Sequence, residues 1–308
     1  MVNPKPMPDQ PSSSASTIRT AVVCRLLGGL SWLTRSFHSF RGRWRLMAWL
    51  NRNWALFAAC GQVTVRTHRG LRMAVDPFEF VGRHIYVEGV YEHECTDLVL
   101  RLVKPGDCFL DVGAHIGYFT LLAARAVGPR GTVHAFEASP HTSGILRENI
   151  TINGLDNVQV HEKAVSDTCG VVTFYTSSRE NLGRSGMLDP GGAAGRALVP
   201  SITVDSLLPQ LLKVKMVKID VEGGEMLVIR GMDALIARDK PYILFELTQE
   251  WLLRMGTEAA SLCGHLKQRG YALFRVNARL ERFDNPPMDQ CNVLAVHDSA
   301  EVCQGQSV

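Results

Sequence analysis

Asp111 and the two glycines behind it form a pattern that predicts chemistry. Asp111 follows the apolar residues 108–110, Gly113 and Gly117 stand four positions apart, and residues 118–127 are apolar and compatible with a helix. A strand, a tight turn and a helix N-terminus in this order present free N–H groups and partial positive charge to a ligand. A carboxylate at this turn would repel a pyrophosphate but attract an ammonium group. The pattern therefore predicts a site for a small molecule that carries a cationic group.

Five acidic residues stand at or just past the ends of predicted strands: Asp111, Glu137, Asp167, Asp220 and Glu246. In open α/β sheets, ligands bind beyond the carboxyl ends of the strands, where the strand order reverses. An acid after the second strand, such as Glu137, can accept hydrogen bonds from both hydroxyls of a ribose. Alternatively, Glu137 only favours the N-terminus of a helix predicted from Pro140. Asp167 could accept from an adenine amino group, although Ser166-Asp167 is also an ordinary turn.

The elements that must position these acids alternate along the chain. Apolar runs predict strands at 108–112, 132–137, 158–165, 171–176, 216–221, 242–247, 271–277 and 291–297. Helical patterns lie at 91–103, 117–127, 140–153, 225–237 and 257–269. Residues 62–67 and 71–75 predict a hairpin, and the Gly-rich residues 183–195 predict a flexible loop. We expect an α/β fold with a doubly wound, mostly parallel, seven-stranded sheet. No helix separates the last two strands, so one of them must be antiparallel.

The glycine spacing separates two kinds of nucleotide site. A dinucleotide site has Gly-x-Gly-x-x-Gly after its first strand, whereas this chain has Gly113 and Gly117 with His115 between them. An NAD(P)-dependent Rossmann-type oxidoreductase is therefore the less favoured alternative, and a non-catalytic binding module docked on a membrane is another. The pattern resembles the Asp-x-Gly-x-Gly-x-Gly turn of class I S-adenosylmethionine-dependent methyltransferases, with His115 at the middle glycine.

Further motifs are similar to those of the FkbM family of methyltransferases. They are Asp-Val-Gly-Ala-His-Ile-Gly-Tyr-Phe-Thr (111–120), Phe-Glu-Ala-Ser-Pro (136–140), Val-Lys-Ile-Asp-Val-Glu-Gly-Gly-Glu (217–225) and Ile-Leu-Phe-Glu (243–246), with Gly-Val-Tyr-Glu (89–92) ahead of Pro-Gly-Asp (105–107). The similarity covers roughly residues 62–298, and the family usually has Asn where His115 stands. The resemblance implies a class I methyltransferase fold and S-adenosylmethionine as the cofactor. The cofactor-binding residues that it implies are Asp111, Gly113, Ala114, His115, Gly117, Glu137, Ala138 and Asp167.

The resemblance also implies methyl transfer to a hydroxyl oxygen on a sugar, glycolipid or polyketide-like acceptor. Such a transfer needs alignment of the two reacting atoms and removal of a poorly acidic proton. Asp220, Glu222 and Glu246 are then the catalytic candidates, either as a base or as ligands of a divalent cation that acidifies the hydroxyl. Capping of the following helix is the alternative for Glu222 and the favoured role of Glu225. Asp220 has no such alternative, because a buried strand seldom ends in an unpaired acid.

Four histidines are candidate bases or ligands by position alone: His93, His115, His134 and His161. A single histidine near a site is more often structural than catalytic. His115 is the one to test, because it lies inside the predicted cofactor turn.

Composition narrows the class of protein. A net charge of +3 over 308 residues argues against a general nucleic-acid binder. The eight cysteines never form a Cys-x-x-Cys pair, which argues against a metal site built on thiolates and favours reduced thiols in a cytoplasmic compartment. Neither a membrane-spanning run nor a secretory signal is evident.

The N-terminal region has a distinct composition. Between Asp9 and Asp76 there are ten arginines and four of the five tryptophans, but no acidic residue. Trp44, Met47, Leu50, Trp54 and Phe57 recur at spacings of three and four and predict a basic amphipathic helix. It could lie on an anionic membrane at the inner face, or pack on the domain with its arginines extended to solvent. A transit peptide is a weaker third interpretation.

These patterns divide the chain into five parts. Residues 1–16 are expected to be a disordered tail, 17–60 a basic amphipathic segment, and 61–104 a hairpin and helix that lead into the domain. Residues 105–298 are expected to form the catalytic domain, and 299–308 a second tail. The expected partner is a small-molecule, glycan or lipid-linked acceptor, with no nucleic acid.

Overall fold

Strand β3 (Cys108–Val112) is buried along its whole length and lies near the centre of an eight-stranded sheet in the computed structural model. The structure describes residues 25–32, 34–35, 42–189, 191–287 and 289–299. The sheet has the order β12-β11-β13-β10-β9-β3-β4-β5. The bounds of its other strands are β4 (Thr132–Phe136), β5 (Val158–His161), β9 (Val214–Ile219), β10 (Tyr242–Leu247), β11 (Tyr271–Val276), β12 (Leu280–Arg282) and β13 (Cys291–His297).

The expected mostly parallel, doubly wound sheet is confirmed. Strands β5, β4, β3, β9 and β10 are parallel, and β13 runs antiparallel to both of its neighbours. The short β12 adds an eighth strand at the outer edge, beyond the seven that were expected. After β3 the chain builds β4 and β5 on one side and later returns to build β9 and β10 on the other. The strand order therefore reverses between β3 and β9, which is where such sheets bind ligands.

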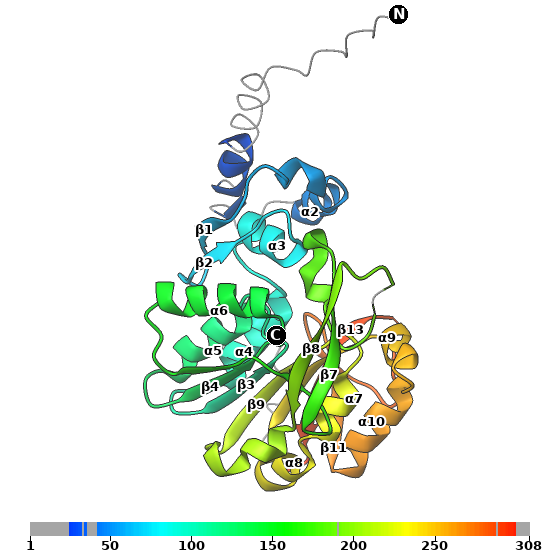
Figure 1. The fold of residues 1–308 in the computed structure, drawn as a ribbon. Coiled ribbons are helices and arrows are strands. Elements are labelled where there is room, and N and C mark those ends of the chain that lie inside the picture. The colour runs from blue at the N-terminus through cyan, green and yellow to red at the C-terminus, as the bar shows by residue number, and fades with distance from the viewer. Residues whose placement is uncertain (1–24, 33, 36–41, 190, 288, 300–308) are drawn as a thin grey trace, which may run out of the picture.

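Each face of the sheet has its own apolar core. Phe109 and Met216 share one core with α4 (His93–Leu102) and α5 (Tyr118–Val127). Leu110 and Val217 share the other with residues of α7 (Glu225–Arg230), α8 (Asp233–Asp239) and α10 (Ala259–Gln268). Figure 1 shows α4, α5 and α6 (Pro140–Ile152) on one side of the sheet and α7, α8 and α10 on the other. Strands covered on both faces are apolar throughout, which explains why β3, β10 and β13 have the bounds that the sequence predicts.

Three elements predicted within residues 105–298 are interrupted, divided or partly replaced in the structure. The expected strand 158–165 is interrupted after β5, and its end forms β6 (Ala164–Val165) in a separate sheet with β7 (Gly170–Thr176) and β8 (Gly195–Ile202). The expected helix 225–237 is divided into α7 (Glu225–Arg230) and α8 (Asp233–Asp239). At the junction, a Cβ on Gly231 would lie 2.0 Å from the carbonyl oxygen of Ser166. The expected loop 183–195 shares its ends with the short helix η2 (Arg179–Arg184) and with β8.

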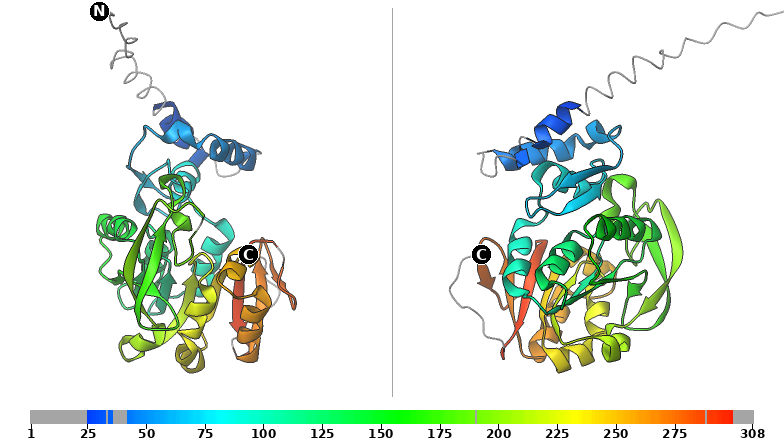
Figure 2. Two further views of the ribbon diagram at one scale, coloured as in Figure 1. Left: turned by 45° about the vertical axis from the view of Figure 1, so that its right-hand side comes forward. Right: turned by 90° about the vertical axis from the view of Figure 1, so that its left-hand side faces the viewer.

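The N-terminal part forms a layer at one end of the sheet (Figures 1 and 2). It contains helical residues 25–32 and 34–35, α2 (Arg43–Arg52), η1 (Trp54–Phe57), α3 (Phe80–Glu88) and the hairpin β1 (Val63–Arg66) and β2 (Arg72–Val75). The hairpin is confirmed, whereas the expected helix 44–57 ends at Arg52 and continues as η1. The expected tail 1–16 lies outside the described residues, and so does the expected tail 299–308 beyond Ser299. Two elements complete the fold: η3 (Val204–Gln210) and α9 (Gln249–Arg254). Among the helices described, none has the length and apolar composition to cross a membrane.

Candidate active site

The turn after β3 is shaped by two glycines that no other residue could replace without movement. Gly113 has φ +82, and a Cβ there would lie 1.8 Å from the carbonyl oxygen of Asp220. Gly117 has φ +93, and a Cβ there would lie 2.4 Å from Cδ1 of Leu146. The N–H groups of Gly113 and Ala114 both donate to the carbonyl oxygen of Phe136. The turn is therefore held close to the ends of β9 and β4, and α5 begins directly behind it.

Glu137 connects the loops that follow β3 and β4. Its Oε2 accepts from the backbone N–H of His115 at 2.9 Å, and its Oε1 accepts from the N–H of Ser139 at 2.8 Å. Burial raises the pKa of the Glu137 carboxyl, while the nearby His115 and the two N–H donors oppose that rise. The carboxylate thus holds the loop geometry, and its remaining lone pairs are available to a ligand.

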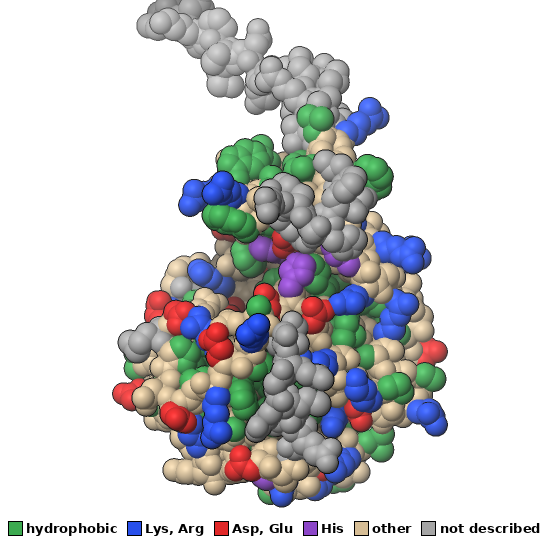
Figure 3. All heavy atoms as spheres, turned by 180° about the vertical axis from the view of Figure 1, so that it is seen from behind, with side chains coloured by type: hydrophobic (Ala, Val, Ile, Leu, Met, Phe, Trp, Pro, Cys, Tyr) green, Lys and Arg blue, Asp and Glu red, His purple; other side chains and the backbone are tan. Residues whose placement is uncertain are grey.

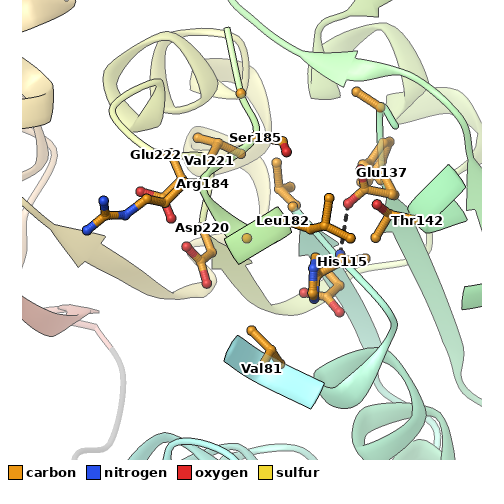
Figure 4. Close-up of a pocket in the computed structure, with 18 of the residues that line it drawn as sticks. Val81, His115, Glu137, Thr142, Leu182, Arg184, Ser185, Asp220, Val221 and Glu222 are labelled. Atoms are coloured by element: carbon orange, nitrogen blue, oxygen red, sulfur yellow. Dashed lines mark hydrogen bonds between the residues drawn. The ribbon is translucent and has the colours of Figure 1, made fainter. Parts of the chain in front are cut away.

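His115 adopts the left-handed conformation, with φ +50. Both of its ring nitrogens are buried without a hydrogen-bond partner in the protein, and its side chain lines the cavity (Figure 4). Buried polar atoms are nearly always satisfied. The imidazole is therefore suited to contact a ligand that carries polar groups.

Asp111 lies at the end of β3 and is almost fully buried. Its Oδ2 accepts from the hydroxyl of Thr120 at 2.5 Å. Burial raises the pKa of Asp111, and the ammonium of Lys218 opposes the rise. The carboxylate lines the cavity, as expected for a group that would face a ligand's ammonium.

A second group of carboxylates lies across the cavity from the turn. One oxygen each from Asp220, Glu222 and Glu246 can be chosen so that all three lie within 4.8 Å of one another. Burial, with the charges of Asp220 and Glu246, raises the pKa of Glu222 to about 9. Burial, with the charge of Asp220, raises the pKa of Glu246 to about 8, although Gln290 donates a hydrogen bond to its carboxylate. Such a cluster can hold a proton near neutral pH or bind a divalent cation.

Lys218 links the two groups of acids. Its buried ammonium donates to Oδ2 of Asp220 at 2.9 Å and lies 4.6 Å from the centre of the Phe119 ring. Burial alone would lower the pKa of this lysine, but the carboxylates of Asp220, Glu92 and Asp111 raise it above its usual range. Lys218 therefore remains charged. The sequence motif contained this residue, yet only its position on a buried strand could have indicated its role.

The two groups face one cavity of about 290 Å³. Figure 4 shows His115 and Glu137 on one side and Asp220, Glu222 and Arg184 on the other, with Val81 of α3 and Leu182 of η2 between them. Sequence reasoning named no individual residue of η2 or α3 for this site, because neither element carries a motif. Tyr91 also lines the cavity, and burial raises its pKa well above the usual range.

The structure brings most of the predicted site residues to the cavity. The lining includes Asp111, Gly113, Ala114, His115, Glu137, Ala138, Asp220, Glu222 and Glu246. Gly117 is absent from the lining and instead packs against Leu146. Asp167 is absent as well, since the break after β5 makes Lys163, Ala164 and Val165 the wall there. The cavity lining therefore gives no support to the expectation that Asp167 faces the ligand.

Glu225 and the remaining histidines have structural surroundings. Oε1 of Glu225 accepts from the N–H groups of Gly223 and Val221, which is the capping role that was favoured for it. His134 and His161 stack on each other, with ring nitrogens 3.1 Å apart, and neither lines the cavity. His93 also lies outside the lining.

Comparison with known proteins identifies the family. The model of the methyltransferase FkbM domain matches residues 111–273. "Methyltransferase 1" of Beauveria bassiana is 27% identical, over 50% of this chain and 67% of its own length. The 31-O-demethyl-FK506 methyltransferase FkbM of Streptomyces tacrolimicus is 30% identical, over 50% of this chain and 68% of its own length. A crystal structure of a methyltransferase FkbM from Methylobacillus flagellatus has a TM-score of 0.42 at 11% identity, over 91% of this chain and 60% of that one.

The family match spans more than half of the chain and contains both sides of the cavity, from Asp111 to Glu246. On this match, together with the sheet topology and the cavity, this chain belongs to the FkbM family and is an S-adenosylmethionine-dependent methyltransferase.

Proposed function

We propose that this methyltransferase acts on a hydroxyl oxygen of a sugar, glycolipid or polyketide-like acceptor. The observation that carries the proposal is the cluster of Asp220, Glu222 and Glu246, which faces the cavity opposite the glycine turn. A hydroxyl must lose its proton as it is methylated, and a carboxylate cluster with raised pKa values is suited to take that proton.

The residues of the turn fit the cofactor in this proposal. Gly113 lets the backbone approach closely, Asp111 offers a carboxylate to the ammonium, and Glu137 offers lone pairs to the ribose hydroxyls. The unpartnered ring of His115 offers a further polar contact. When bound, S-adenosylmethionine supplies an electrophilic methyl group on a sulfonium, which a hydroxyl oxygen can accept.

The carboxylates on the other side of the cavity would take up the proton of the acceptor hydroxyl. Glu246 and Glu222 are mostly protonated at neutral pH when no cation is present, given their raised pKa values. Asp220 differs because the Lys218 ammonium donates a hydrogen bond directly to its Oδ2. We therefore assign Asp220 as the acceptor of the hydroxyl proton, with Glu222 and Glu246 beside it. A divalent cation bound by the three oxygens is an alternative way to acidify the hydroxyl.

The surroundings of the catalytic domain belong to the same proposal. We place the domain at residues 105–298, with 61–104 leading into it and 17–60 as a segment that contacts the inner face of a membrane from the cytoplasm. This arrangement would suit a lipid-linked or glycan acceptor. The packing of α2 and α3 supports it, because α3 lines the cavity and α2 packs on α3.

Two measurements test the proposal. Calorimetry should show binding of S-adenosylmethionine and weaker or no binding of NAD; tighter NAD binding would reject it in favour of an oxidoreductase. Extracts incubated with labelled methyl donor should yield a labelled product that mass spectrometry identifies as an ether. Asp220→Ala and Glu246→Ala should each lower that yield roughly a hundredfold or more. Unchanged transfer by both variants would remove the support for the proposed site.

A further inference from the structure

The helices of the N-terminal layer carry large apolar side chains on their outer side. Among the described residues, nine large hydrophobic side chains are exposed, and five of them lie between residues 26 and 56. Trp44 is 70% exposed, Leu26 is 69% exposed, Trp32 is 65% exposed and Trp49 is 53% exposed. Exposed tryptophans gathered at one end of a molecule indicate a surface that meets another apolar phase.

These exposed side chains are not needed to fill the core. In α2 the inward side chains of Met47 and Leu50 are buried, whereas Trp44 and Trp49 point outward. At about 100° per residue, Trp44, Arg45, Trp49 and Arg52 fall within an arc of about 140° on one side of the helix. The buried side of α2 is formed by other residues, Met47 and Leu50.

The preceding helix has the same division. Leu27 and Ser31 are buried, and the hydroxyl of Ser31 donates to the carbonyl oxygen of Tyr86 at 2.6 Å. Arg25, Leu26 and Trp32 are exposed. We call the outward residues of the two helices the N-terminal face: Arg25, Leu26, Trp32, Trp44, Arg45, Trp49 and Arg52.

The charge of this face identifies what it fits. Arg25, Arg45 and Arg52 are exposed, and the guanidinium of Arg45 lies 5.2 Å from the ring centre of Trp44. The sequence has no acidic residue between Asp9 and Asp76. Figure 3 shows hydrophobic and basic side chains gathered over this end of the molecule. Tryptophan prefers the interface between lipid chains and headgroups, and arginine pairs with phosphate.

We propose that the N-terminal face docks on an anionic phospholipid bilayer. Docking would place α2 flat on the membrane, since the exposed rings and guanidinium groups lie on one side of it. The layer is also joined to the cavity. Oδ1 of Asn51 in α2 accepts from Nε of Arg83 in α3 at 2.8 Å, and α3 contributes Phe80 and Val81 to the cavity lining. This docking deepens the membrane contact in the proposed function by naming the face and the lipid, and the consequence that the acceptor is presented at the membrane rests on that function.

Vesicle co-sedimentation of the full chain tests this proposal. The protein should sediment with phosphatidylcholine vesicles that contain phosphatidylglycerol, and much less with phosphatidylcholine alone. Trp44→Ser with Trp49→Ser, and separately Arg45→Gln with Arg52→Gln, should each lower the sedimented fraction roughly tenfold. The matched control is Leu198→Ser with Arg196→Gln, which alters exposed residues of β8 and should change nothing.

The result is separable from the function of the cavity. All variants should keep the wild-type affinity for S-adenosylmethionine in calorimetry, which also reports correct folding. Equal sedimentation of wild type and both double variants would overturn the proposal. The proposal would also be overturned if the protein bound an oligonucleotide more tightly than vesicles and the same variants lost that binding. The N-terminal face would then be a nucleic-acid-binding surface.

Discussion

The two sides of the cavity use carboxylates in opposite ways. On the β3–β4 side, Asp111 and Glu137 are bound by donors of the protein, from Thr120, His115 and Ser139. On the β9–β10 side, Glu222 and Glu246 lie near Asp220 and near each other, and burial together with the neighbouring charges raises their pKa values. The first arrangement fixes the shape of a binding site before the ligand arrives. In the second arrangement the carboxylates repel one another unless a proton or a cation lies among them. This suits a site where charge changes during the reaction.

The variant with the largest expected effect on ligand binding by the β3–β4 side is Gly113→Ala. A Cβ would meet the carbonyl oxygen of Asp220 at 1.8 Å, and the positive φ would be strained as well. We expect no measurable binding of S-adenosylmethionine in calorimetry. Gly106→Ala is the matched control, because Gly106 also has a positive φ of +92 but nothing within 4 Å of the added Cβ. Equal loss in both variants would attribute the effect to backbone strain rather than to the close approach.

Lys218→Met tests the link between the two sides. It removes a buried ammonium that faces three carboxylates and so leaves their charges uncompensated. We expect a loss of about 3–5 kcal/mol in the free energy of unfolding at pH 8, measured with urea. The loss should be smaller at pH 5, where the carboxylates take up protons more readily. Lys215→Met on the same strand is the control, and a similar loss there would contradict the special role of Lys218.

The raised pKa values on the second side predict a pH dependence of stability. The unfolded chain ionises Glu222 and Glu246 near pH 4.5, whereas the folded protein keeps these protons until about pH 8 to 9. Their contribution to stability is therefore complete below pH 4.5 and is lost as the pH rises toward 9. With a chelator present, the melting temperature of Glu222→Gln/Glu246→Gln should rise relative to that of wild type as the pH increases across this range. If the melting temperatures of the two proteins change in parallel with pH, the proposed repulsion is refuted.

A cation provides a second measurement of the same repulsion. If Mg²⁺ or Mn²⁺ binds the three oxygens, it should raise the melting temperature of wild type at pH 8 and leave the double variant unchanged. An equal rise in both proteins would place the cation elsewhere.

The smallest expected effect is that of His115→Asn. Asparagine tolerates the left-handed conformation and keeps the backbone N–H that donates to Glu137. Only the ring contact is lost, so we expect the affinity for S-adenosylmethionine to fall by about tenfold at most. A loss of binding as complete as that of Gly113→Ala would show that the imidazole itself organises the first side.

The sequence predicted acids on both sides of the cavity, but only for the first side did it also indicate what holds them in place, and the reason is physical. The turn after β3 depends on residues 111–117 and their local geometry, which spacing alone expresses. The second side depends on contacts between distant segments, such as the charges of Glu92 and Asp111 on Lys218. No local pattern encodes such proximity. Asp167 lies outside the cavity lining for a related reason, since the strand expected over 158–165 breaks after β5 and its end pairs with the distant β8.

The N-terminal helix shows the same limit. The spacing of Trp44, Met47, Leu50, Trp54 and Phe57 predicted a single apolar face. In the structure α2 ends at Arg52, so the last two residues lie on η1 instead. Met47, Leu50 and Phe57 are buried, while Trp44 is exposed. Packing on the domain and an exposed aromatic surface, which were alternatives from the sequence, coexist in the structure.

One calorimetric experiment tests the division of the cavity most directly. S-adenosylmethionine is titrated into wild type, Glu137→Gln and Glu222→Gln/Glu246→Gln, with folding of each checked by thermal melting. We predict that Glu137→Gln weakens binding by about tenfold or more, because its carboxylate holds two N–H groups of the turn. The double variant should bind as wild type does. Equal weakening in both would contradict the account, since the β9–β10 carboxylates would then hold the cofactor.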